Sequence, residues 1–319
     1  MTGASKHFLA CVGFLLVGCS TPNFLPSDSS AAEKKAIAFL SREVPTWSRL
    51  NGCFSCHNNG DGARALYLAS KHHYRLPGPV LDDTTRWLEN PAQWDKNKGD
   101  TGFSDQRLAN LQFAAALVVA VDAGVIDPSK LQPAADRVAR DQAPSGQWPI
   151  DQHNPVGSPT TYGSTLATFM ALSVLERRHS FTNELARARR ALKSCEPNNT
   201  VSAAVVLLAS SHGVDFGKKA EAALNFVLSS QKTGGGWGPY ADAAAEAFDT
   251  ALALLALQAH ASSGSPSISQ AIGKGRSFLA HEQLQDGSWL ATTRPAGNQS
   301  YAQQVSTTAW ATIALLETR

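Results

Sequence analysis

The sequence predicts an all-α protein in which about six helical hairpins form two concentric layers closed into a ring. The first observation is a short motif, Gln-x3-Gly-x-Trp, which occurs three times and begins at Gln142, Gln231 and Gln283. The second is that the segments after the motif are rich in Ala and Leu and almost uncharged, which is typical of helices buried on most sides. Repetition of this kind predicts an architecture built from copies of one supersecondary unit.

Each unit is expected to be a helix, a turn and a second helix. The glutamine lies in the last turn of the first helix, where its amide can bond free backbone groups, and the glycine allows the bend. The second helix carries Thr-x5-Ala-Leu, starting at Thr165, Thr250 or Thr308. Fainter copies bring the number of hairpins to six, with spans of about 32–73, 79–124, 128–179, 182–213, 215–261 and 266–318.

The repeat resembles the QW repeat of the squalene–hopene and oxidosqualene cyclases. The resemblance is carried by Lys274-Gly275, by Phe278-Leu279 before the last motif, and by the three motif copies in register with Thr-x5-Ala-Leu. It covers residues 32–319 and implies an α/α toroid, the fold that these cyclases share with protein prenyltransferase β subunits. An unrelated helical solenoid is the alternative.

The resemblance also locates the position of the catalytic acid in class II cyclases. Those enzymes carry Asp-x-Asp-Asp-Thr-Ala at the head of an inner helix, and the middle Asp protonates the polyene. The matching residues here are Glu246 to Ala251, with Phe248 at the acid position. Phe248 has no proton to give, so we expect no class II cyclisation. Two weak catalytic candidates remain, Asp249 in the supporting position and Glu246. A carboxylate placed like Glu246 near the start of a helix more commonly caps the helix than acts as a catalyst.

The first hairpin contains Cys53-Phe54-Ser55-Cys56-His57 where the other units carry Gly-x-Trp. Cys-x-x-Cys-His is the attachment motif for c-type haem: the thiols form thioethers with the vinyl groups, and the imidazole is the proximal iron ligand. The motif therefore predicts haem c bound covalently by Cys53 and Cys56, with His57 on the iron. A disulfide between the two cysteines and a zinc site with a fourth ligand are the alternatives.

The sixth ligand of such a haem is left open by the sequence. His72 or His73 is the nearest candidate for the distal position. Met170 lies in an apolar second helix, where packing in the core is the simpler expectation. A five-coordinate iron is also possible.

The N-terminus predicts export and lipid attachment. Residues 1–18 read as a signal peptide, because a basic start is followed by an apolar run too short to be a permanent membrane helix. The run ends in Leu16-Val17-Gly18-Cys19, which resembles the lipobox of bacterial lipoproteins and implies lipidation of Cys19. A plain secretory signal is the alternative. Residues 19–31 read as a flexible tether. Ser20, which follows the lipidated cysteine, favours anchoring in the outer membrane over the inner membrane, with the protein on the periplasmic side.

Nucleic acid is not expected as a partner, because the net charge is +2, charged residues make up 17% of the chain and no basic run is present. Three other functions are consistent with the features of the sequence. The first hypothesis is a lipid-anchored, haem-bearing toroid that serves electron transfer or haem-linked sensing with a redox partner protein. The second is an enzyme or binder that takes an apolar isoprenoid ligand inside the ring. The third is a scaffold lipoprotein.

Overall fold

The computed structural model describes Met1 and residues 27–97, 105–153, 156–178, 180–294, 297 and 299–319. The predictions for the signal peptide, Cys19 and most of the tether lie outside the described residues. The first helix begins at Ser27, so residues 27–31, expected to be tether, are helical instead. Glu33 in this helix is buried and bonds Tyr74, Arg276 and Arg319, which ties the start of the chain's first helix to the rest of the ring.

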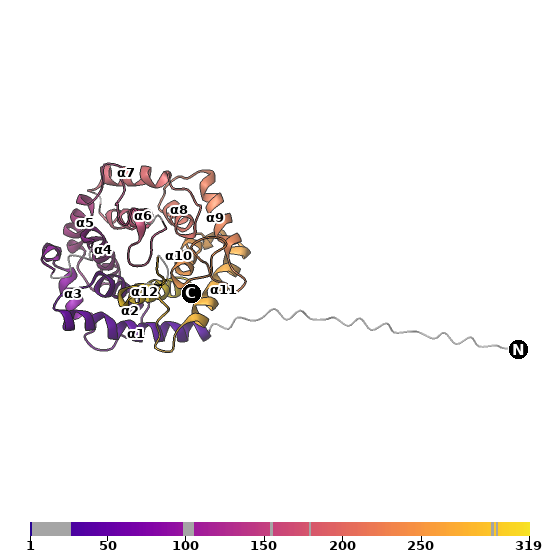
Figure 1. The fold of residues 1–319 in the computed structure, drawn as a ribbon, viewed down its shortest axis with the longest axis horizontal. Coiled ribbons are helices and arrows are strands. Elements are labelled where there is room, and N and C mark those ends of the chain that lie inside the picture. The colour runs from indigo at the N-terminus through magenta and orange to yellow at the C-terminus, as the bar shows by residue number, and fades with distance from the viewer. Residues whose placement is uncertain (2–26, 98–104, 154–155, 179, 295–296, 298) are drawn as a thin grey trace.

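Twelve α-helices in the described residues form two concentric layers (Figure 1). The outer layer consists of α1 (Ser27–Asn51), α3 (Asp82–Leu88), α5 (Leu131–Arg140), α7 (Thr182–Lys193), α9 (Lys218–Ser230) and α11 (Pro266–Glu282). The inner layer consists of α2 (Ala63–Lys71), α4 (Gln106–Asp122), α6 (Gly163–Leu175), α8 (Thr200–Ser211), α10 (Ala247–Gln258) and α12 (Tyr301–Glu317). The predicted all-α toroid of six hairpins is confirmed.

Short helices of other types complete the chain. A π-helix, η1 (Cys56–Gly62), leads directly into α2, so the inner helical segment of the first hairpin starts within the Cys-x-x-Cys-His motif. In the described part of the chain, three 3-10 helices lie between the longer elements: η2 (Pro91–Lys96), η3 (Pro128–Lys130) and η4 (Ala261–Ser263).

The two layers differ in burial as their compositions predict. In α10 every residue except Leu255 and Gln258 is buried, whereas in the outer helix α7 the buried residues are Ala188 and Leu192. An inner helix is covered by its neighbours in the ring and by the outer layer, which is why small apolar residues dominate it. In the part of the chain that is described, no helix has the length and apolarity needed to cross a membrane.

The glutamine of each motif links one hairpin to the next. Its side-chain amide donates to the carbonyl oxygen of the glycine in its own motif and to a backbone carbonyl at the start of the following outer helix. The acceptors in the following helix are Glu184 for Gln142, Ala271 for Gln231 and Ala32 for Gln283, each at 2.9 Å. Because Ala32 belongs to α1, the bond from Gln283 joins the last hairpin to the first and closes the ring.

The glycine of each motif packs against the same following helix. Gly146, Gly235 and Gly287 have φ of 90°, 95° and 94°. A Cβ atom at these positions would lie 2.3–2.4 Å from a backbone carbonyl oxygen of that helix. Glycine is therefore needed both for its backbone conformation and for the close approach of the two hairpins.

The tryptophan of each motif joins the two helices of its own hairpin. The indole N–H donates to a carbonyl of the outer helix, at 2.7 or 2.8 Å. The backbone N–H donates to a threonine hydroxyl of the inner helix: Thr168 for Trp148, Thr250 for Trp237 and Thr308 for Trp289. In the third hairpin this threonine is Thr168, whereas Thr165, which begins Thr-x5-Ala-Leu, lies one turn earlier in α6.

We expect the Gln283→Ala variant to lower the free energy of unfolding by about 1–3 kcal/mol, because it removes the two bonds that the amide makes to the carbonyl oxygens of Ala32 and Gly287. Gln270→Ala, on the exposed side of the same helix, is the control and should change it by less than about 0.5 kcal/mol. Denaturant unfolding measures both. Equal stabilities of the two variants would contradict this role for the glutamine.

Candidate functional site

A cavity of about 390 Å³ lies on the axis of the ring. All six inner helices contribute to its wall, mostly through residues near their C-terminal ends. One residue from each helix in order is Leu68, Val119, Phe169, Leu208, Leu255 and Ile313. The polar residues Gln258 and Glu317 also line it, and Glu317 is exposed, so the mouth reaches solvent on the face formed by the C-terminal ends of the inner helices.

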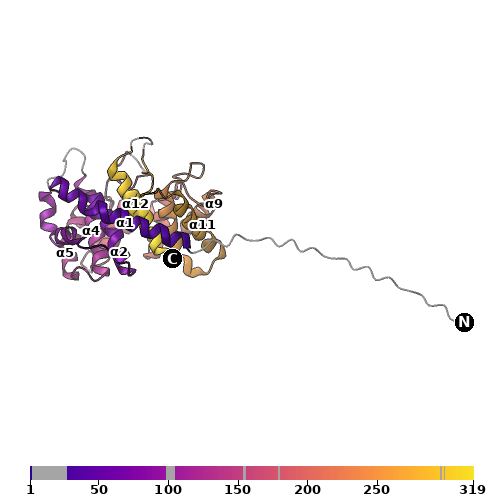
Figure 2. The same ribbon diagram turned by 90° about the horizontal axis from the view of Figure 1, so that it is seen from below.

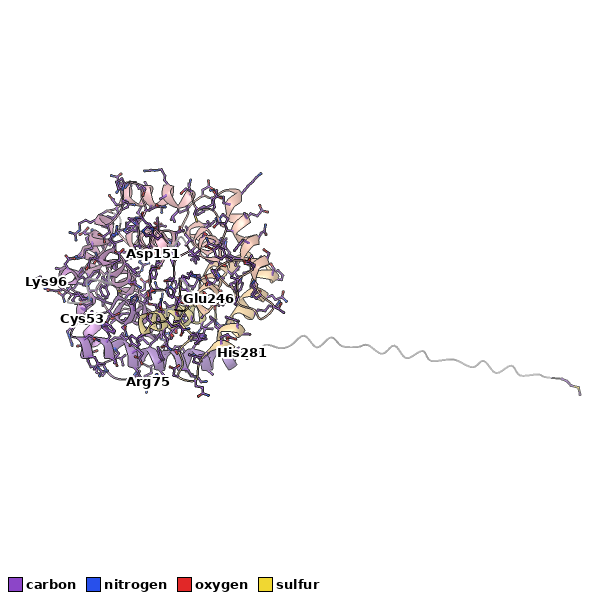
Figure 3. The ribbon with its side chains drawn as sticks, viewed as in Figure 1. Cys53, Arg75, Lys96, Asp151, Glu246 and His281 are labelled. Carbon is purple, nitrogen blue, oxygen red and sulfur yellow. The ribbon has the colours of Figure 1, made fainter. Side chains whose placement is uncertain are left out.

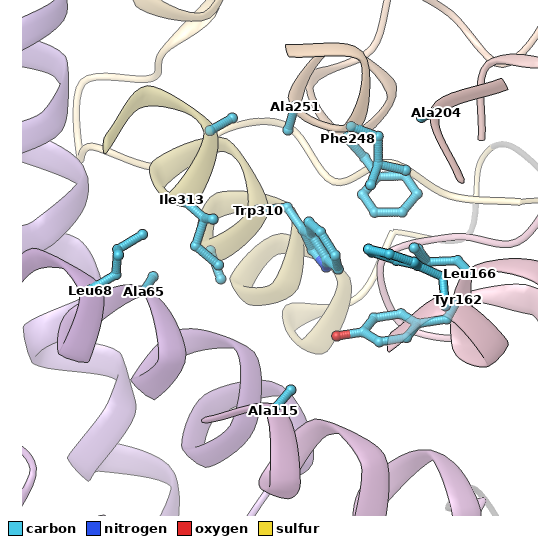
Figure 4. Close-up of a cluster of buried hydrophobic side chains, with 14 of the residues drawn as sticks. Ala65, Leu68, Ala115, Tyr162, Leu166, Ala204, Phe248, Ala251, Trp310 and Ile313 are labelled. Atoms are coloured by element: carbon cyan, nitrogen blue, oxygen red, sulfur yellow. The ribbon is translucent and has the colours of Figure 1, made fainter. Parts of the chain in front are cut away.

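The inner end of the cavity is formed by Arg64 and Trp310. The guanidinium carbon of Arg64 lies 4.2 Å from the centroid of the Trp310 ring. The rings of Tyr162 and Phe248 pack edge-on against Trp310, with centroids at 5.6 and 5.7 Å, and the three side chains lie close together (Figure 4). This aromatic cluster lies between the apolar cavity and a group of buried polar residues.

The buried polar group is centred on Asp61, which lies in η1 and is fully buried. Its carboxyl group accepts hydrogen bonds from Tyr162, from the amide of Gln112 at 2.7 Å and from the hydroxyl of Ser306 at 2.9 Å. The donors come from three different parts of the inner layer. Burial raises the pKa of Asp61, and the nearby Arg64 and these hydrogen bonds oppose that shift.

His57 is connected to the same group through Ser306. Its Nδ1 atom lies 3.1 Å from the Ser306 hydroxyl oxygen. Since that hydroxyl donates its own proton to Asp61, the hydrogen-bond network assigns the imidazole proton to Nδ1 and leaves a lone pair on Nε2. Burial lowers the pKa of His57 to about 4, so the ring is neutral at physiological pH.

The structure keeps Cys53, Cys56 and His57 close together. Cys53 is buried, Cys56 is partly buried, and both are free thiols. The Sγ atom of Cys56 lies 3.7 Å from Nε2 of His57, and burial raises the pKa of this thiol to about 12. The loop is fixed by Asn97, whose side chain bonds the backbone N–H and carbonyl of Phe54 at 2.9 and 2.6 Å.

The motif lies away from the axial cavity. Figure 3 shows Cys53 near the rim of the ring, and neither cysteine nor His57 lines the cavity. His72 and His73 follow the C-terminal end of α2, so the last five residues of η1 and the nine of α2 separate them from His57 by about 20 Å along the helix. The structure does not bring these candidate distal ligands to the motif. Within the described residues there is no cluster of three or more potential metal ligands.

The cyclase-like segment at the head of α10 closes the opposite face of the ring. Phe248 and Asp249 are fully buried. Arg294 binds the carboxylate of Asp249, that of Glu246 at 3.2 Å, and the carbonyl oxygen of Gly157. Burial raises the pKa of Asp249, and the Arg294 guanidinium opposes the shift. The two weak catalytic candidates are thus ion-pair partners that tie the loops before α6 and α12 to α10.

Sequence reasoning missed the residues at the centre of this arrangement, chiefly Asp61, Arg64 and Tyr162. A signal was present for two of them. Inner helices are otherwise nearly uncharged, yet the first hairpin places an acid at Asp61 and a base at Arg64 within one turn. Met170, expected to pack in the core, lies in the cavity wall with its sulfur 3.9 Å from Arg64.

Solved structures of a type II terpene cyclase share this fold. MstE from Scytonema without ligand superimposes with a TM-score of 0.59 and 15% identity, covering 92% of this chain and 98% of that one. An arginine variant of MstE bound to geranylgeranyl dihydroxybenzoate gives 0.59 and 14%, with 92% and 97% covered. The chain therefore has a terpene cyclase-like toroid fold. No protein-family model and no curated protein matches the sequence.

The burial of Asp61 leads to a prediction about pH. Folding raises the pKa of this carboxyl group above the value of about 3.9 that it has in the unfolded chain. Such a group lowers the stability of the protein as the pH rises above that unfolded-state pKa. We therefore expect the free energy of unfolding of the wild type, minus that of Asp61→Asn, to fall as pH increases from about 4 to 8. The slope cannot exceed about 1.4 kcal/mol per pH unit.

Denaturant unfolding of both proteins across this range provides the measurement. An increase of the difference with pH would show that the hydrogen bonds and Arg64 outweigh burial and favour the carboxylate.

Proposed function

We propose that the ring binds an apolar, isoprenoid-like ligand in its axial cavity. The observation that carries this proposal is a space of about 390 Å³ with a wall built by all six inner helices from mainly apolar side chains. An engineered apolar cavity of about 150 Å³ is enough to bind benzene, so this one suits a considerably longer chain. Its size is also in the range typical of ligand sites.

The similarity to MstE supports the class of ligand. That enzyme has been solved with geranylgeranyl dihydroxybenzoate as substrate and with merosterolic acid A as product. In this chain Phe248 occupies the position of the cyclase acid, and Arg294 binds the carboxylates of Asp249 and Glu246. We therefore propose ligand binding without polyene protonation from the head of α10.

Filling the cavity tests this proposal. Leu208→Trp should weaken the binding of farnesol, measured by titration calorimetry, by at least about tenfold, because the larger side chain occupies the ligand space. Val125→Trp, at an exposed position outside the cavity, is the matched control and should bind farnesol as the wild type does. Equal binding by Leu208→Trp and wild type would contradict a ligand site on the axis.

We also propose that Cys53 and Cys56 carry covalent haem with His57 as proximal ligand. The lone pair on Nε2, with Nδ1–H held by Ser306, supports this, because iron-ligating histidines are usually oriented by such a bond. The group would supply a one-electron change at iron for electron transfer or sensing. The present position of the Cys56 sulfur, 3.7 Å from Nε2, requires that this side chain turn away when haem is attached.

Export belongs to the same proposal, since bacterial c-type haem is attached outside the cytoplasmic membrane and Cys19 would hold the mature chain there by lipid. Expression in a host with cytochrome c maturation should give an intact mass that includes haem and a diacylglyceryl group on Cys19. Cys53→Ser combined with Cys56→Ser should lose the haem mass alone, and Cys195→Ser should keep both. A wild-type chain without haem, with Cys53 and Cys56 joined in a disulfide, would overturn the haem proposal. A mature N-terminus other than lipidated Cys19 would overturn the anchor.

A further inference from the structure

We propose that Arg64 makes the axial cavity a site for a long-chain carboxylate, with the carboxylate bound at the inner end and the apolar chain directed to the mouth. The proposal rests on the proposed function of the cavity and names the ligand class it takes. It is motivated by one residue that the fold leaves unsatisfied.

Arg64 is a buried cation without a hydrogen-bonding partner for most of its guanidinium group. It is 5% exposed, and its Nε and Nη2 atoms have no partner among the described residues. Its Nη1 atom contacts the sulfur of Met170 at 3.9 Å, which is a weak acceptor. Taking an ion out of water without a partner is costly, so an arginine in this state is poised to receive an acceptor.

The free atoms of Arg64 match a carboxylate in geometry. Nε and Nη2 lie on one edge of the planar guanidinium, and their N–H bonds point in nearly the same direction. Both atoms are enclosed by the surrounding side chains, so a ligand in the cavity reaches them when the wall beside Arg64 moves. Two such donors fit the two oxygens of one carboxylate in a bidentate pair. The plane of the group is held by Trp310, whose ring centroid is 4.2 Å from the guanidinium carbon, so little side-chain freedom is lost on binding.

The charges along the cavity fix the direction of the ligand. Among the described residues that line the cavity, Arg64 is the one cationic side chain, and Glu317 at the mouth would repel an anion there. Asp61 is close enough for its pKa to be affected by Arg64 but makes no ion pair with it, and its oxygens are taken by Tyr162, Gln112 and Ser306. A single cation suits a monoanionic carboxylate better than a diphosphate.

The test compares ligands that share one chain and differ in the head group. Titration calorimetry measures the binding of farnesoic acid, farnesyl phosphate and farnesol at about pH 8, where a carboxyl group with a pKa near 4 is ionised. We expect the wild type to bind farnesoic acid about tenfold to a hundredfold more tightly than farnesol. Arg64→Leu should lose this preference, so that the ratio of its affinities for the acid and the alcohol falls to about one.

Arg64→Lys provides the second variant, because it keeps the charge but not the bidentate edge. It should retain part of the preference for the acid, and circular dichroism establishes that each variant is folded. Equal binding of the acid and the alcohol by the wild type would overturn the role of Arg64 but would still support an apolar ligand site in the axial cavity. Tighter binding of the phosphate would overturn the carboxylate assignment. Failure of all three probes to bind would overturn the ligand site itself.

Discussion

The ring is held closed by a repeated hydrogen bond between a glutamine amide and the main chain of the next outer helix. Gln142, Gln231 and Gln283 each make this bond at 2.9 Å, and the bond from Gln283 to Ala32 connects the two ends of the repeat. The same amide also donates to the carbonyl oxygen of the glycine at which neighbouring hairpins approach each other. Three of the six junctions between hairpins carry this link, and one of them joins the last hairpin to the first.

Closure of six hairpins leaves a central space that the inner helices fill unequally. Toward the N-terminal ends of these helices, aromatic rings, the Asp61 group and the bonds of Arg294 occupy the axis. Toward the C-terminal ends the wall is made of shorter apolar side chains, which leave the cavity. In the side view α12 runs between the two faces of the ring (Figure 2). Its residues Ser306, Trp310 and Glu317 belong in turn to the polar group, the aromatic cluster and the mouth.

The fold could be predicted because the residues of the repeat lie at short, fixed separations in the sequence. Gln, Gly and Trp contact fixed partners one helix away, so their pattern identifies the hairpins directly. The Asp61 group could not be predicted in the same way, because its members, Gln112, Tyr162 and Ser306 among them, meet only after the ring has closed. The missing partner of Arg64 is likewise a property of the folded wall, although a charge in an inner helix was visible in the sequence.

A crystal structure of the protein grown with farnesoic acid shows most directly whether Arg64 and the axial cavity form one ligand site. We expect an elongated ligand along the axis, its carboxylate paired with Nε and Nη2 of Arg64 and its chain against Phe169, Leu208 and Ile313. A cavity that contains ordered water, or one closed by its own side chains with the acid bound elsewhere, would contradict this expectation.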